Sequence, residues 1–210
     1  MNLFLWGLAM IITIATNNEH KLVEIRQILE PLGYKVRSLF EAGVEIKPEE
    51  NGTTFFENAK IKARAVYALV KAPVIADDSG LEVECLNNAP GVHTAIYGGE
   101  SLSARERCEF LIKELANAGQ TPIERKAKFV CVIHCILDEG VEFAVSGCVE
   151  GFIANKLTGE NGFGYDPVFM LNEHESMATI ETERKNKISH RAKALEKFSK
   201  EISERANLKV

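Results

Sequence analysis

The chain has 210 residues, of which 46% are hydrophobic and 26% charged, and its formal net charge is −5. A chain of this length fits one domain and can bury a sizeable core without disulfides or a structural metal. The acidic balance argues against a protein that binds duplex nucleic acid, because neutralising backbone phosphates needs a basic surface. It leaves open a small phosphate ligand, which needs only a few local cations.

The N-terminal segment, residues 1–14, is largely apolar. It has no basic region and no evident cleavage site, and it is too short to span a bilayer. We predict a buried first strand over Met10–Ala15 and regard residues 1–9 as an atypical apolar extension. No other stretch predicts a membrane span, so we expect no membrane partner.

The five cysteines contain no C-x-x-C pair. Cys131 and Cys135 share one face of a probable strand, which favours small buried hydrophobic residues over a redox or metal site. A reduced, cytoplasmic protein is therefore expected.

Strand and helix patterns alternate in the first half of the chain. The first strand leads through Thr16-Asn17-Asn18 into a helix whose apolar face carries Leu22, Ile25 and Leu29, and Gly33 is a stop signal. An extended stretch over 35–39 and an acidic loop over 48–52 follow.

The next predicted helix has a clear start. Thr54-Phe55-Phe56-Glu57 matches a capping box, which is sufficient to explain Glu57, and alanine-rich sequence continues to about Val70. Pro73–Ala76 then predicts a short buried strand that ends in the turn-like sequence Asp77-Asp78-Ser79-Gly80.

The second half is richer in β patterns. Lys128–Leu137 and Val141–Val149 predict a hairpin, and a glycine-rich loop begins at Gly159. A final helix carries Leu195, Phe198 and Ile202 on one face. The pattern predicts an α/β fold with a mixed central sheet flanked by helices, in one elongated domain (1–210) with two lobes and a cleft between them.

Acidic residues follow the predicted strand at Asp77 and Asp78 and recur in the earlier loop at Glu49 and Glu50. Magnesium prefers hard oxygen ligands, and a carboxylate beside it can accept a proton from an attacking water. The same Asp-Asp-Ser-Gly string is also a good turn sequence, so its pattern alone leaves both interpretations open.

Two segments could contact phosphate groups or a base edge. Thr16 to Lys21 spans a predicted helix start, where backbone N–H groups attract anions; an ordinary cap with a solvated lysine is the alternative. Arg184 to Arg191 is the densest basic cluster, with Ser189 as a natural cap. Its Lys185 could meet a phosphate, and His190 and Arg191 could donate to a base carbonyl, although a solvated charge run is the alternative.

The glycine-rich loop adds aromatic residues to this set. Phe163 or Tyr165 could stack on a base and Asp166 could fix the polar edge of the base, or the aromatics could belong to the core. His134 stands alone on a strand and is interpreted as structural.

Six segments, in this order, closely resemble the inosine triphosphate pyrophosphatase family. They are Thr16 to Lys21, Glu49 to Ala59, Ala76-Asp77-Asp78-Ser79-Gly80-Leu81, Ala89-Pro90-Gly91-Val92, Gly162-Phe163-Gly164-Tyr165-Asp166-Pro167, and Lys185 to Arg191. The resemblance covers the chain from about residue 11 to residue 200. It implies hydrolysis of the deaminated purine nucleotides ITP, dITP and XTP to a monophosphate and pyrophosphate, with Mg²⁺ as cofactor and a homodimeric assembly.

The resemblance also implies site residues. Asp78 is expected to be the general base and to hold Mg²⁺ together with Glu49. The residues expected to bind substrate are Thr16, Asn17, Asn18, Glu19, His20, Lys21, Ser79, Phe163, Gly164, Tyr165, Asp166, Lys185, His190 and Arg191.

One motif departs from the family. Its usual Tyr-Ser-Ala-Arg-Tyr is His93-Thr94-Ala95-Ile96-Tyr97 here, so Ile96 replaces an arginine. Two rival functions remain: a pyrophosphatase for modified pyrimidine nucleotides, and a non-catalytic nucleotide sensor.

Overall fold

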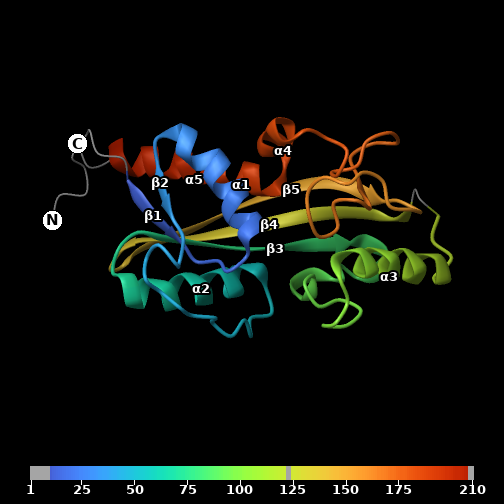
Figure 1. The fold of residues 1–210 in the computed structure, drawn as a ribbon, viewed down its shortest axis with the longest axis horizontal. Helices are drawn as coiled ribbons and strands as arrows, with labels where there is room; N and C mark the ends of the chain where they lie inside the picture. Colours follow the sequence, from blue (N-terminus) through green and yellow to red (C-terminus); the bar gives the residue numbers. More distant parts are fainter. Residues whose placement is uncertain (1–9, 122–123, 208–210) are drawn as a thin grey trace. The chain divides into compact units, whose positions relative to one another are not determined.

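The computed structural model describes residues 10–121 and 124–207, and residues 1–9 of the predicted extension lie outside them. It contains a six-stranded sheet in the order β2-β1-β3-β4-β5-β6 with helices packed on it (Figure 1). β1 is parallel to both β2 and β3, whereas β5 and β6 are antiparallel, so the prediction of a mixed α/β sheet is confirmed.

The elements follow one another in this order. The strands are β1 (Ile11–Ile14), β2 (Lys35–Arg37), β3 (Val74–Val83), β4 (Lys126–Asp138), β5 (Val141–Ile153) and β6 (Phe169–Met170). The α-helices are α1 (Glu19–Leu29), α2 (Phe55–Val70), α3 (Ala104–Asn117), α4 (Thr182–Ile188) and α5 (His190–Asn207). Short 3₁₀ helices span Glu30–Leu32 (η1), Glu84–Leu86 (η2) and Gly91–His93 (η3).

The chain divides into two compact units. The first unit comprises the described residues of Met1–Asp78, Val132–Gly147 and Arg191–Val210, and the second comprises those of Ser79–Cys131 and Cys148–His190. Among the described residues, no helix is both long enough and apolar enough to cross a membrane.

In the first unit, α1 and α5 cover one face of the strands and α2 covers the other (Figure 1). The predicted apolar face of α1 is buried, with Leu22, Ile25 and Leu29 all 5% exposed or less. The capping box at the start of α2 is formed as predicted: Thr54 accepts from the Glu57 backbone N–H, and the Glu57 carboxylate accepts from the Thr54 N–H. These local signals therefore place both helices correctly.

The second unit has its own core, built from β3, β4, β5 and α3. It includes Leu81, Leu111, Phe129 and Phe169, all buried. The helix α3 is not among the predicted elements, although it too begins with a capping box, formed by Ser103 and Glu106. The predicted hairpin is confirmed, because β4 ends at Asp138 and β5 begins at Val141.

The predicted end of the third strand is wrong. β3 does not stop at Ala76 but continues through Asp77-Asp78-Ser79-Gly80 to Val83. A strand can pass through two adjacent carboxylates when each has a compensating cation, because a buried charge is tolerated only when it is paired. The structure supplies such cations to both aspartates.

Candidate active site

The centre of the candidate site is a set of charged residues that we call the carboxylate cluster: Asp77 and Asp78 with Lys21, Lys62 and Arg191. Successive side chains of a strand point to opposite faces, so the two aspartates separate. Asp77 lies 3.0 Å from both the Lys21 ammonium and the Arg191 guanidinium. Asp78 lies 2.7 Å from the Lys62 ammonium, on the side of α2.

Asp77 is a fixed anion. Its side chain is 1% exposed, and the Arg191 guanidinium that pairs with it also donates to Glu24. Burial by itself would raise the pKa of Asp77, but the charges of Lys21 and Arg191 outweigh it and hold this pKa far below its usual range. Asp77 therefore stays ionised and joins α1 to α5 through β3.

Asp78 has the opposite balance. Burial raises the pKa of its carboxyl to about 6, although the Lys62 ammonium acts in the opposite direction. A carboxylate whose pKa lies close to neutrality is suited to general-base work, because it is deprotonated yet basic enough to accept a proton. Asp78 also accepts a long hydrogen bond, 3.4 Å, from Asn58.

Lys62 links Asp78 to the acidic loop. Its ammonium lies 2.7 Å from Asp78 and 2.6 Å from Glu50. Burial lowers the pKa of Lys62, but the charges of Asp78 and Asp77 and the hydrogen bonds to Asp78 and Glu50 together outweigh this effect, so the pKa is raised and the ammonium stays charged. Lys62 thus connects Glu50 to Asp78, and both Glu49 and Glu50 lie at solvent-exposed positions of the acidic loop.

Lys62 and Asn58 are site residues that the motif analysis missed. They occupy buried positions on α2 together with Ala59, Ala63 and Val66. A lysine and an asparagine spaced four residues apart on an otherwise apolar helix face will contact the same neighbour. These two polar residues within the apolar face of α2 are the sequence signal from which they could have been identified.

The donor set is compatible with a magnesium ion. Magnesium usually takes one or two carboxylates and completes its shell with water and substrate phosphate oxygens. Asp78 and the acidic loop at Glu49 and Glu50 supply oxygens of this kind. In the described part of the chain, no group of three or more His, Cys, Asp or Glu residues is arranged to hold a metal by itself. A magnesium ion held by Glu49 and Asp78 therefore stays a prediction.

The predicted phosphate segment forms the turn from β1 into α1. Asn18 caps the helix by accepting from the Lys21 N–H, and the Asn18 N–H donates to Thr16. The Asn17 amide donates to the Ile46 carbonyl, which fixes the segment against the chain just before the acidic loop. Glu19 and His20 are exposed in the first turn. Within this segment, the Lys21 ammonium lies 3.0 Å from the Asp77 carboxylate and so belongs to the carboxylate cluster.

In the second unit, the glycine loop (residues 159–166) folds around the Asp166 carboxylate. Asp166, 3% exposed, accepts from the Phe163 N–H at 2.8 Å and from the Lys185 ammonium at 2.7 Å. That ammonium also lies 5.1 Å from the centre of the Phe163 ring. The structure thus places Lys185 with Asp166 and Phe163, and its predicted contact with a phosphate stays a prediction.

Two further contacts hold the glycine loop. The buried Tyr165 donates its hydroxyl to the Thr94 carbonyl, and the Cys108 thiol of α3 contacts the Gly164 carbonyl at 3.3 Å. Neither Thr94 nor Cys108 was predicted as a site residue. Their importance depends on contacts between residues that are distant in sequence, which a motif does not display.

The last predicted residues occupy both units. His190 is buried in the second unit, where its ring stacks on Phe129 at 4.9 Å between centroids. Arg191 belongs to the first unit, where its guanidinium donates to Asp77 and Glu24, so its donation to a base stays a prediction. Ser79 begins the second unit directly after Asp78. Ile96, where the family usually has arginine, is 45% exposed.

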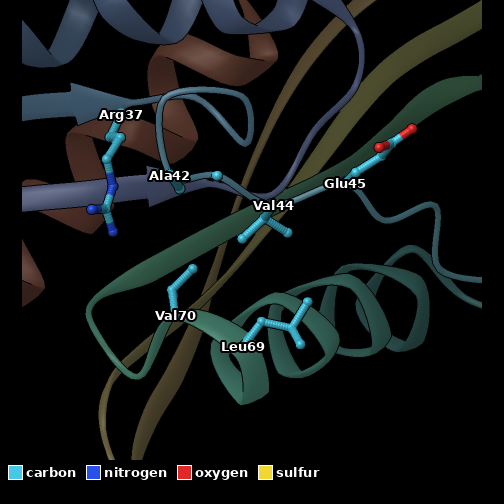
Figure 2. Close-up of a pocket in the computed structure, with 7 residues that line it drawn as sticks. Arg37, Ala42, Val44, Glu45, Leu69 and Val70 are labelled. Carbon is cyan, nitrogen blue, oxygen red and sulfur yellow. The ribbon is translucent and has the colours of Figure 1, made fainter.

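A separate hollow of about 480 Å³ lies in the first unit (Figure 2). Its lining residues are Arg37, Ala42, Gly43, Val44, Glu45, Leu69 and Val70. None of the predicted site residues lines it, so it is not part of the candidate site.

Known proteins resemble this chain over most of its length. The model of the Ham1 family matches residues 12–201. Two relatives, each named dITP/XTP pyrophosphatase, come from Clostridium perfringens and Bacillus subtilis. The first is 44% identical, covering 88% of this chain and 93% of the relative. The second is 45% identical, covering 89% and 95%.

Solved structures show the same likeness. A HAM1 protein from Coxiella burnetii superposes with a TM-score of 0.83 at 38% identity, covering 93% of this chain and 99% of the other. The Staphylococcus aureus Ham1 protein gives 0.81 at 38% identity, with the same coverage.

Proposed function

The chain belongs to the Ham1 family, and we propose that it hydrolyses the deaminated purine nucleotides dITP, ITP and XTP to a nucleoside monophosphate and pyrophosphate. The observation that carries this proposal is the buried Asp78 carboxyl, whose pKa is raised to about 6 beside the Lys62 ammonium. A carboxylate in this state is a competent base for activating water.

In the proposed reaction, Asp78 accepts a proton from a water molecule as the water oxygen attacks the α-phosphorus. The bond from the α-phosphorus to the bridging oxygen breaks, and pyrophosphate leaves with the electron pair. A bound Mg²⁺ would neutralise phosphate charge and favour ionisation of the water. Lys62 and Lys21 supply positive charge beside the two aspartates. The ion pairs of the buried Lys62 and the half-buried Lys21 with the aspartates keep this charge fixed before the reaction begins.

The remaining predicted residues bind the substrate in this proposal. The turn Thr16–Lys21 and Ser79 contact the triphosphate, helped by the exposed N–H groups at the start of α1. Phe163 and Tyr165 of the glycine loop contact the base, and the Asp166 carboxylate and Lys185 ammonium fix this loop.

Selection against adenine follows from hydrogen bonding at the 6-position of the purine. Hypoxanthine and xanthine present a carbonyl acceptor there, whereas adenine presents an amino donor. Donors from His190 or Arg191 would be left unpaired by adenine, at a cost of about 1–3 kcal/mol for each buried group.

The proposal includes the finer expectations of the family resemblance. These are dependence on Mg²⁺ held by Glu49 and Asp78, a homodimer, a location in the cytoplasm, and a single domain with its site in a cleft between two lobes. The Asp78 carboxylate supports the first of these as one oxygen ligand, and the acidic-loop carboxylate beside Lys62 is that of Glu50.

Product analysis tests the reaction itself. Purified protein with Mg²⁺ and XTP or dITP should release pyrophosphate and the monophosphate, and Asp78→Asn should abolish release while remaining folded. Release of orthophosphate and a diphosphate would contradict attack at the α-phosphorus. Binding of XTP without turnover by the wild-type protein would favour the sensor, and turnover of modified pyrimidine nucleotides alone would favour the other rival.

Glu49 and Glu50 form a matched pair for testing the metal site. If Glu49 is a ligand, Glu49→Gln should raise the Mg²⁺ concentration needed for half-maximal rate by about tenfold, since one lost ligand contact costs roughly 1.4 kcal/mol. Glu50→Gln removes a partner of Lys62 and should change this concentration much less. The reverse order would assign the ligand role to Glu50.

A further inference from the structure

Thr94, at the C-terminal end of η3, joins two segments that are distant in sequence. Its hydroxyl donates to the Gly91 carbonyl at 2.5 Å and accepts from the Leu81 N–H at 3.0 Å. Its backbone carbonyl accepts from the Tyr165 hydroxyl at 3.3 Å. All of these residues belong to the second unit.

The Thr94 hydroxyl provides the hydrogen-bond acceptor for the Leu81 N–H of β3. Leu81 is fully buried, and a buried backbone N–H must find a partner. Farther along this strand the returning chain supplies backbone partners, as in the bond from the Val83 N–H to the Ala89 carbonyl. At Leu81 the partner is a side-chain hydroxyl instead, so the conformation of β3 at this point depends on the residue type at position 94.

Both segments held by Thr94 carry predicted substrate contacts. Leu81 lies two residues after Ser79, on the same strand and next to Gly80, which is also buried. Tyr165 lies within the glycine loop, 2% exposed, between Gly164 and Asp166. A displacement of Thr94 would therefore move Ser79 and the glycine loop relative to each other.

We propose that Thr94 is a positioning residue that sets Ser79 and the glycine loop at the correct separation for one nucleotide. This inference rests on the proposed function, because it takes Ser79 as a phosphate contact and the loop as the base contact. Thr94 would touch no substrate atom itself. Its hydroxyl would act through Leu81 and its carbonyl through Tyr165.

The expected kinetic signature is a change in KM rather than kcat. Asp78 and Lys62 belong to the first unit, whereas Thr94 belongs to the second. Loosening the two binding segments weakens contacts made equally in the ground state and the transition state, which raises KM and leaves kcat unchanged. Because both segments that bind the nucleotide would lose their fixed position, we expect a rise in KM of about tenfold or more.

Thr94→Val and Thr94→Ser form the test pair, because valine keeps the shape and loses the hydroxyl, whereas serine keeps the hydroxyl. For XTP and dITP, Thr94→Val should raise KM about tenfold or more with kcat within about twofold, and Thr94→Ser should restore the wild-type KM. Tyr165→Phe removes the hydrogen bond from the Tyr165 hydroxyl to the Thr94 carbonyl and should raise KM by a smaller factor. If Thr94→Val does not fold, Tyr165→Phe still tests whether Thr94 positions the glycine loop.

Amide hydrogen exchange gives a readout that does not depend on turnover. In Thr94→Val, exchange should accelerate in residues 79–82, and in Tyr165→Phe it should accelerate in residues 162–166. Thr94→Ser should match the wild type in both segments. A folded Thr94→Val protein with wild-type KM and wild-type exchange would overturn the inference. If the wild-type protein turned over neither nucleotide, the proposed function would fail, and the exchange data would still decide whether Thr94 holds these two segments.

Discussion

Asp77 and Asp78 are neighbours in the sequence, but their surroundings give them different tasks. Asp77 is held between Lys21 and Arg191, which keep it ionised, whereas burial raises the pKa of Asp78 towards neutrality. The string Asp-Asp-Ser-Gly does not reveal this division, because it depends on which helix covers each face of β3. One carboxylate stabilises the fold and the other is placed to react.

Two asparagine substitutions should separate these tasks. Asp77→Asn leaves Lys21 and Arg191 buried without their shared anion, and breaking a buried pair typically costs about 3–5 kcal/mol. Asp78→Asn removes the base and should abolish turnover with a much smaller loss of stability. Chemical denaturation and pyrophosphate release on both proteins check this. Equal losses of stability would contradict the assignment.

The pH dependence of kcat/KM should report Asp78. A general base must be deprotonated, so activity should fall as the pH drops through about 6 and be level above it. Because Lys62 lowers this pKa, Lys62→Met should move the acid limb to higher pH. Raising Mg²⁺ should move it to lower pH, since a bound cation favours the ionised carboxylate. An acid limb that none of these changes moves would show that another group is titrating.

At the scale of elements, the local signals were the most reliable. The capping box at Thr54 and the apolar face of α1 specify short-range contacts, and both predictions are confirmed. The end of β3 was predicted wrongly because the cations that let the strand continue come from α1, α2 and α5, far away in sequence. A turn-like string therefore became part of a strand through tertiary pairing.

The capping box also offers a test at this scale. Thr54→Ala removes the cap of the helix that carries Asn58 and Lys62, and such a loss costs about 1 kcal/mol. For a protein of this size, that corresponds to a fall in Tm of roughly 2–4 °C. A thermal melt measures it, with Thr54→Ser, which keeps the capping hydroxyl, as the matched control. The rate at low temperature should stay close to that of the wild type.

The glycine loop provides another prediction. Gly162 has a φ of +79°, and a Cβ at this position would overlap the Asp166 carboxylate and lie 3.1 Å from the Lys185 ammonium. Gly162→Ala should therefore disturb the Lys185–Asp166 pair and raise KM for XTP. Gly33→Ala, which also has positive φ but open space around its Cβ, is the matched control for backbone strain alone. Similar KM values for the two variants would exclude a role for the close packing.

For the whole molecule, the sequence predicted the fold class and the motifs, whereas the partners of each motif residue had to come from the structure. The predicted substrate residues are divided between the two units, and two of the points where the chain crosses between units fall at Asp78–Ser79 and His190–Arg191. Lys62, Glu24 and Phe129 were missed because their contacts join elements that no short motif contains. Glu49 and Glu50 are both exposed, and spacing does not show that Glu50 is the one paired with Lys62.

The most direct test of the central claim is a comparison of kcat/KM for XTP, dITP, GTP and ATP with Mg²⁺, in the wild-type protein and in Asp78→Asn. We predict rapid pyrophosphate release from XTP and dITP, little from ATP, whose base presents an amino donor at the 6-position, and none from the folded Asp78→Asn protein. Equal turnover of all four nucleotides would contradict the proposed selectivity. Undiminished turnover by Asp78→Asn would contradict the role of Asp78 as the base.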